Sequence, residues 1–150
     1  NGLCLALDSI RDPGNLGTIM RIADWFGVEG IYASLDTVDV YKPKVIQASM
    51  GTIFRKNLIY CNLPELCRHF TASGMQVFGT FLEGDNIYEC SLPKEGLIIM
   101  GNEADGISAE VAAELSQRLN IPNFSKGVGA ESLNVASATA VTLSEFRRRC

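Results

Sequence analysis

The chain has 150 residues, of which 47% are hydrophobic and 20% are charged, as in an ordinary soluble globular domain. Its formal net charge is −4, which argues against binding nucleic acid through charge alone. The sequence has no apolar stretch long enough to cross a bilayer, and it does not open like a signal peptide. These features exclude membrane proteins and strongly basic nucleic-acid binders.

Cysteine usage points to a reducing compartment. The sequence contains five cysteines, no C-x-x-C pair and a single histidine, His69. An odd count without paired spacing argues against a zinc site or a disulfide framework. We therefore expect no metal and a cytoplasmic location.

The first half of the chain alternates apolar runs with helical patterns. Leu3–Asp8 predicts a buried strand, and the apolar spacing of Asn15–Phe26 predicts a helix that Gly27 can terminate. Gly30–Ser34 is the second expected strand, and Pro43–Ser49 is a short helix. This alternation is typical of an α/β domain with a mainly parallel sheet and helices on both faces.

The second half keeps the same alternation. Leu97–Met100 has the length and composition of a buried strand, and Ser108 suits the N-cap of a helix over Ala109–Gln117. The last expected helix is Ser132–Arg148. The other expected elements are strands Asn57–Cys61, Met75–Phe81 and Arg118–Ile121, helix Leu63–Ala72, a turn at Asp85–Ile87 and a loop at Ser125–Ala130.

Three short polar segments, far apart in sequence, stand out. They are Asn15–Arg21, Gly101–Glu103 and Ser132–Asn134, and the first two follow apolar runs that predict buried strands. Open α/β sheets bind ligands at the carboxyl ends of their strands. A carboxylate, a guanidinium, two amides and a hydroxyl could therefore converge on one crevice.

Each segment also has a purely structural interpretation. Asn15 could cap its helix while Arg21 is solvated, since residues six apart do not share a helix face. If Asn15 precedes the regular helix, both side chains could still reach one pocket. Glu103 could lie in a solvated turn, or Gly101 could let the backbone approach a ligand closely.

The third segment is equally open. Ser132 could simply cap the last helix. Asn134 is harder to explain this way, because Asn is a poor helix former.

The common nucleotide and hydrolase motifs are absent from the sequence. It contains no G-x-x-x-x-G-K-[ST] loop, no G-x-S-x-G elbow and no G-x-G-x-x-G after a strand.

Taken in order, the polar segments resemble the three motifs of the SpoU (TrmH-like) RNA 2′-O-ribose methyltransferases of the SPOUT superfamily. Motif 1 corresponds to Asp12–Arg21 and motif 2 to Leu97–Ile107. Motif 3 corresponds to Ile121-Pro122 together with Glu131–Ala136. The match covers nearly the whole chain.

The resemblance implies an α/β fold whose C-terminal part forms a deep trefoil knot, and it implies a homodimer. It also implies that loops of the knot hold S-adenosylmethionine, largely through backbone groups. Carried over to this sequence, the cofactor-binding residues are Thr80, Phe81, Leu82, Gly101, Ile121 and Leu133.

The implied reaction is methyl transfer to a ribose 2′-hydroxyl of ribosomal or transfer RNA, without DNA or membrane partners. Arg21 would be the residue nearest the hydroxyl in the active dimer; it would bind an adjacent phosphate and stabilise the developing alkoxide. The residues that would orient Arg21 and the ribose are Asn15, Glu103, Ser132 and Asn134.

Two other functions fit part of the pattern. One is a non-catalytic RNA-binding or assembly module that keeps the fold, and the other is a nucleotide-binding domain of flavodoxin-like type. Many members of the resembled family carry an RNA-binding domain before the catalytic one. We therefore expect residues 1–150 to be the catalytic domain of a longer protein.

Overall fold

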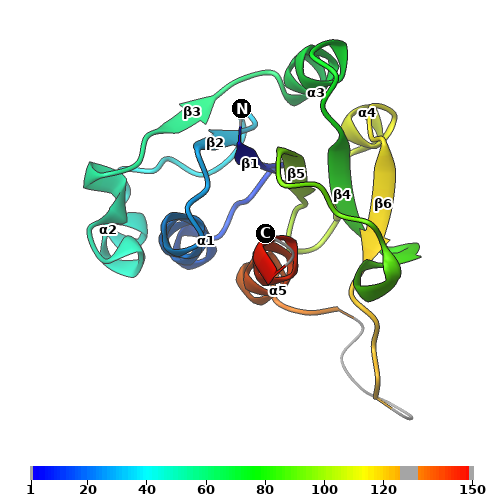
Figure 1. Ribbon diagram of the computed structural model, residues 1–150. Coiled ribbons are helices and arrows are strands. Elements are labelled where there is room, and N and C mark those ends of the chain that lie inside the picture. Colours follow the sequence, from blue (N-terminus) through cyan, green and yellow to red (C-terminus); the bar gives the residue numbers. More distant parts are fainter. Residues whose placement is uncertain (1, 126–131, 149–150) are drawn as a thin grey trace.

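The computed structural model describes residues 2–125 and 132–148 (Figure 1). Its centre is a six-stranded sheet in the order β3-β2-β1-β5-β4-β6, with every pairing parallel. The strands are β1 (Leu3–Leu7), β2 (Gly30–Ala33), β3 (Leu58–Tyr60), β4 (Val77–Asn86), β5 (Gly96–Met100) and β6 (Gln117–Asn120). The helices are α1 (Pro13–Trp25), α2 (Pro43–Ser49), α3 (Leu63–Ala72), α4 (Ala109–Ala112) and α5 (Val135–Arg148), with 3-10 turns at Thr52–Phe54 and Ile87–Glu89.

Helices cover both faces of the sheet, as predicted. α1, α2 and α5 lie on one face, and α3 and α4 lie on the other (Figure 1). The central strands β1 and β5 are buried at every position. Strands enclosed on both faces are continuously apolar, which is why these two runs are clear in the sequence.

The strand order excludes the flavodoxin-like fold that one alternative requires. Flavodoxin-like sheets run 2-1-3-4-5, whereas here β5 lies between β1 and β4. The flavodoxin-like interpretation is therefore wrong. The trefoil knot stays a prediction, because part of the segment that would form it, 126–131, lies outside the described residues.

Several element bounds differ from the prediction. β4 continues to Asn86 through the expected turn, because it resumes pairing with β6 at Asp85. α4 ends at Ala112. Gln117, the predicted last residue of that helix, instead begins β6, and the N–H of Ser116 just before it donates to the Val77 carbonyl. α1 begins earlier, at Pro13. Most of the expected loop Ser125–Ala130 lies outside the described residues.

Helix α1 is held from both sides in a way that positions its first turn. A Cβ on Gly17 would lie 2.5 Å from the Val45 carbonyl oxygen, so glycine is required for close packing on α2. At the other end of α1, the Arg147 side chain of α5 donates to the carbonyls of Phe26 and Gly27, at 2.7 and 2.9 Å. α5 thus runs beside α1.

Within residues 2–125 and 132–148, every helix is too short or too polar to span a bilayer.

Candidate active site

The candidate site lies where the ends of β1 and β5 meet the first turns of α1 and α5. Asp12 is the N-cap of α1, and its carboxylate accepts the Asn15 N–H at 3.0 Å. Pro13 follows at the first helical position, where a missing N–H costs nothing. Asn15 is therefore the third residue of the helix and not its cap, which settles one of the open alternatives.

Glu103 is the centre of a hydrogen-bond network that joins β5 to α1. Its two carboxylate oxygens accept the backbone N–H groups of Arg11 and Asp12, at 3.2 and 2.8 Å. The Asn15 side-chain amide donates to the same carboxylate at 3.3 Å. Glu103 is thus tied to the start of motif 1 and is more than a solvated turn residue.

These contacts also control the charge of Glu103. Partial burial opposes ionisation, but the N–H donors of Asp12, of Glu103 itself, of Arg11 and of Asn15 together outweigh it. The pKa of Glu103 therefore lies below its ordinary value. The site holds a stable carboxylate at neutral pH.

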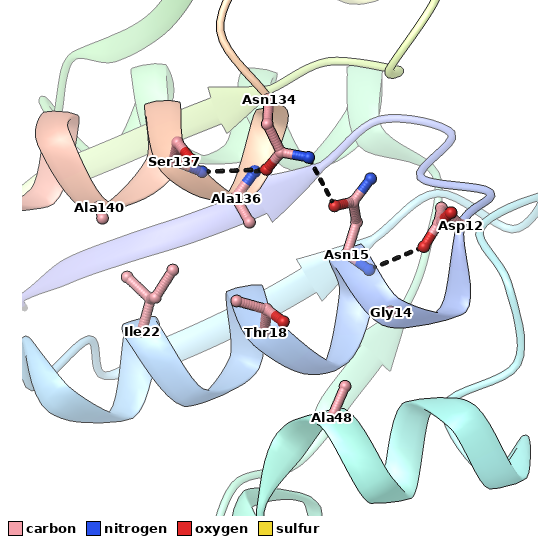
Figure 2. Close-up of a pocket in the computed structure, with 10 residues that line it drawn as sticks. All are labelled: Asp12, Gly14, Asn15, Thr18, Ile22, Ala48, Asn134, Ala136, Ser137 and Ala140. Atoms are coloured by element: carbon pink, nitrogen blue, oxygen red, sulfur yellow. Dashed lines mark hydrogen bonds between the residues drawn. The ribbon is translucent and has the colours of Figure 1, made fainter.

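Asn134 connects the third motif to the same network. Its side-chain amide donates to Asn15 Oδ1 at 3.0 Å, and its own oxygen accepts the N–H groups of Ala136 and Ser137, at 2.8 and 3.2 Å (Figure 2). Asn134 is therefore the N-cap of α5 as well as a partner of motif 1. The alternative that Ser132 caps this helix is wrong, because Ser132 is exposed and lies two residues before the cap.

A pocket of about 510 Å³ opens beside this network (Figure 2). One face of α1, the first turns of α5 and Ala48 of α2 line it. Asp12, Asn15 and Asn134 form its polar end, while Ile22, Ala136 and Ala140 extend it as an apolar groove between the helices.

Arg21 stands apart from this polar cluster. It is exposed on α1, and it does not line the pocket. Within the described ranges 2–125 and 132–148 it has no hydrogen bond or ion pair. The structure thus brings together Asn15, Glu103 and Asn134 within one chain, but not Arg21 or Ser132.

The predicted cofactor residues gather at the same edge of the sheet. Pairing of Gly79 with Ile99, and of Thr80 with Leu119, places Phe81, Gly101 and the end of β6 at one level. The Thr80 hydroxyl lies 3.8 Å from Met100 Sδ. Leu82 and Leu133 have exposed side chains, and Ile121 is half-buried against the core. The edge thus offers backbone groups framed by apolar side chains.

Of the two interpretations of the Gly101–Glu103 segment, the structure supports a turn as the reason for glycine at position 101. A Cβ at this position would lie 2.4 Å from the Gly106 carbonyl carbon and 2.5 Å from the Ile107 nitrogen. The glycine is therefore required by the turn from Gly101 to Gly106 itself, and close approach of a ligand is not needed to explain it. Its backbone contact with a cofactor stays a prediction.

Sequence reasoning missed two supporting groups. Asn102 shapes the loop around Glu103: its side-chain oxygen accepts the N–H groups of Ala104 and Asp105, and its amide donates to the Ser9 carbonyl. An Asn followed shortly by Asp-Gly, as in Asn102–Gly106, is a recognisable turn signal. It was available in the sequence.

The second missed group lies at the ends of β1 and β2. Asp36 accepts hydrogen bonds from Ser34 and Ser9 and pairs with Arg11 at 2.9 Å. Hydrogen bonds from the Ser34 hydroxyl, the Ser9 hydroxyl and the Arg11 guanidinium lower the pKa of Asp36. Ser9 has a positive φ of 60°, which no sequence pattern indicated. In the parts of the chain described, no group of three or more histidines, cysteines and acidic residues could hold a metal ion.

Comparison with known proteins places this geometry in a family. The model of the SpoU rRNA Methylase family matches residues 2–144. The 23S rRNA (guanosine(2553)-2′-O)-methyltransferase RlmP of Bacillus subtilis is 33% identical over 144 residues, covering 95% of this chain and 57% of that protein. The chain spans about half the length of the curated relatives it matches.

Two solved structures share the fold over nearly the whole chain. An AdoMet-bound rRNA methyltransferase from Sinorhizobium meliloti has a TM-score of 0.89 at 36% identity, covering 99% of this chain and 57% of that one. A protein from Porphyromonas gingivalis, assigned to the TrmH family of RNA methyltransferases, has a TM-score of 0.91 at 46% identity, with coverages of 99% and 60%.

Proposed function

Because the chain belongs to the SpoU rRNA methylase family, we propose that it transfers a methyl group from S-adenosylmethionine to a ribose 2′-hydroxyl of RNA. The observation that carries this proposal is the linked cluster of Asn15, Glu103 and Asn134. It joins three segments that are far apart in the sequence and that each match a family motif. A structural module without catalysis would not need all three polar groups in one hydrogen-bond network.

The strand edge fits the proposed cofactor. Backbone carbonyls of Phe81 and Leu82, the Gly101 backbone and the exposed apolar side chains of Leu82 and Leu133 would hold it. When bound, S-adenosylmethionine supplies an electrophilic methyl group on a sulfonium sulfur. An apolar frame with backbone acceptors suits its adenine ring and its amino groups, and it explains why no glycine-rich phosphate loop is needed.

Arg21 would supply the positive charge at the reacting ribose. A guanidinium does not readily give up a proton, so a role as a base is unsuitable. Arg21 would instead bind a neighbouring RNA phosphate and stabilise negative charge as it develops on the ribose oxygen. Asn15, Glu103, Ser132 and Asn134 would orient the ribose and Arg21.

The separation of Arg21 from the cluster supports a homodimer with shared sites. Thr18, Arg21, Ile22 and Trp25 lie on one face of α1, and the Trp25 side chain is 84% exposed. The apolar groove along α1 and α5 continues this surface. A second copy packed there would cover these apolar groups, and it would bring the partner's Arg21 to the Glu103 cluster.

The substrate would be a structured ribosomal or transfer RNA, consistent with the curated relatives. We further propose that residues 1–150 act as a catalytic domain, and that their net charge of −4 leaves most RNA capture to other surfaces. A cytoplasmic location is consistent with Cys4, Cys61 and Cys67, which are free thiols.

The test is a methyl-transfer assay with labelled S-adenosylmethionine and RNA from cells that lack the gene. The expected product is RNA whose new label sits on a ribose 2′-oxygen, read as a bond that resists alkaline cleavage. Label on a base would contradict the proposal. Binding of RNA without either cofactor binding or transfer would favour the non-catalytic module.

A further inference from the structure

A short excursion from the sheet lies at the edge proposed to hold the cofactor. Thr80 and Asp85 both align with Leu119 of β6, so the four residues between them, Phe81–Gly84, leave the strand ladder. We call this segment the Phe81–Gly84 excursion. Its residues have no partner in the β4–β6 register, so its backbone groups can take partners from side chains.

β6 supplies those partners through its side chains. The Asn120 amide nitrogen donates to the carbonyls of Phe81 and Leu82, at 3.0 and 2.9 Å. An Asn side chain has two N–H donors, which matches two adjacent carbonyls. One side chain thus fixes the direction of both carbonyl groups.

Two further contacts hold the same segment. The Arg118 guanidinium lies over the Phe81 ring, 4.4 Å from its centroid. At Gly84 a Cβ would lie 3.0 Å from the Arg118 backbone, so a larger residue would have to push that backbone away. The excursion is therefore fixed at its start, its middle and its end.

We infer that Asn120 is a positioning residue for S-adenosylmethionine, because its amide holds the two carbonyls that the cofactor would contact. This inference rests on the proposed function. Cofactor contact through backbone groups depends on how firmly the backbone is held, since an ordered site spends less free energy on binding. Arg118 supports the same segment because its guanidinium packs on the Phe81 ring.

The variants Asn120→Ala and Asn120→Asp test this role. Alanine removes both donors, and the Kd for S-adenosylmethionine in calorimetry is expected to rise about tenfold, equivalent to about 1.4 kcal/mol. Aspartate keeps the shape but sets a carboxylate against two carbonyls, so its Kd should rise further. In both variants KM for the cofactor should rise while kcat at saturation stays within about twofold of wild type.

The aspartate variant offers a signature that a merely structural role would not produce. Facing two carbonyls, its carboxyl is expected to have a raised pKa. Protonation restores one donor, so lowering the pH from about 8 to about 5 should narrow the gap between its Kd and that of the wild type.

Asn62→Ala is the matched control. Asn62 caps α3 through a 3.0 Å bond to the Glu65 N–H, so its loss should lower the melting temperature without changing the cofactor Kd. If the Asn120 variants do not fold, Arg118→Met provides the test, with an expected two- to threefold rise in Kd.

Wild-type Kd in the folded Asn120 variants, or in Arg118→Met where it is needed, would overturn the inference. Absence of cofactor binding by the wild-type protein would instead refute the proposed function.

Discussion

The Glu103 network at the start of α1 and the outer face of the same helix differ in how their side chains are bonded. On its inner end, Asn15 is bonded to Glu103 and to Asn134, and Asp12 both caps the helix and donates its N–H to Glu103. On its outer face, Arg21 has no bonding partner within the described ranges, and Trp25 is exposed. One half of the proposed site is internally complete, and the other half presents a charge and a large apolar side chain to its surroundings.

This difference gives the two regions separate roles in the proposed site. A preorganised network orients groups without having to rearrange during the reaction. A free guanidinium is suited to a substrate phosphate or to the site of a second subunit.

The largest effect is expected for Arg21→Ala. Loss of the cation should lower methyl transfer more than about 100-fold, since one removed transition-state contact costs that much in other enzymes. Cofactor Kd and melting temperature should stay near wild-type values, because Arg21 lies outside the network. Arg68→Ala is the control: Arg68 is also exposed, and it pairs with Glu114 near α4. Equal loss of transfer and cofactor binding in Arg21→Ala would show that this role is wrong.

Glu103→Gln should affect both activity and stability. Glutamine has one acceptor oxygen in place of two, so one N–H of the network loses its partner and meets an amide donor instead. Transfer should fall at least about tenfold, and the free energy of unfolding should fall by about 1 kcal/mol, the low end for an exposed charged acceptor. Urea unfolding together with the transfer assay measures both; unchanged values would mean that the network is incidental.

Asn134→Ala should cost about 1 kcal/mol of unfolding free energy through loss of the α5 cap. It also removes the bond to Asn15, so transfer should fall more than in Asn62→Ala, which loses a cap of the same type at α3. If both variants lost stability and activity equally, the Asn15–Asn134 bond would have no separate role.

The smallest effect concerns acid stability. The pKa of Glu103 is lowered in the folded chain. The stabilisation by its carboxylate is therefore fully present above the unfolded pKa of 4.5, and it is lost as the pH falls through the folded pKa. The stability difference between wild type and Glu103→Gln should therefore be constant near neutrality and shrink below about pH 4.5. A difference that persists at lower pH would contradict the assigned charge state.

Much of the fold could be predicted because its strands are enclosed. β1 and β5 are apolar at every position, and Pro43–Ser49 and Leu63–Ala72 begin and end as predicted. The extension of β4 could not be predicted, because its polar, glycine-containing sequence is typical of a turn, and pairing with β6 overrides that preference.

The site was predictable in part. The convergence of Asn15, Glu103 and Asn134 is confirmed, since motifs at strand ends meet at one edge. Ser132 and Asn134 are both good capping residues, and the choice depends on the tertiary bond from Asn134 to Asn15. The distance of Arg21 from the cluster depends on the helix starting at Pro13. The catalytic and cofactor roles stay predictions.

Mixed dimers test most directly whether the two halves meet across a subunit interface. Arg21→Ala and Glu103→Gln chains, each strongly impaired alone, would be co-expressed with different tags and the heterodimers purified. If the site takes Arg21 from one chain and Glu103 from the other, the purified heterodimers should show about half of wild-type transfer, because one of the two sites in each heterodimer is intact. If both groups act within one chain, every site keeps a defect. If heterodimers shown to be intact transfer no more methyl groups than the single variants do, a site shared between two subunits is contradicted.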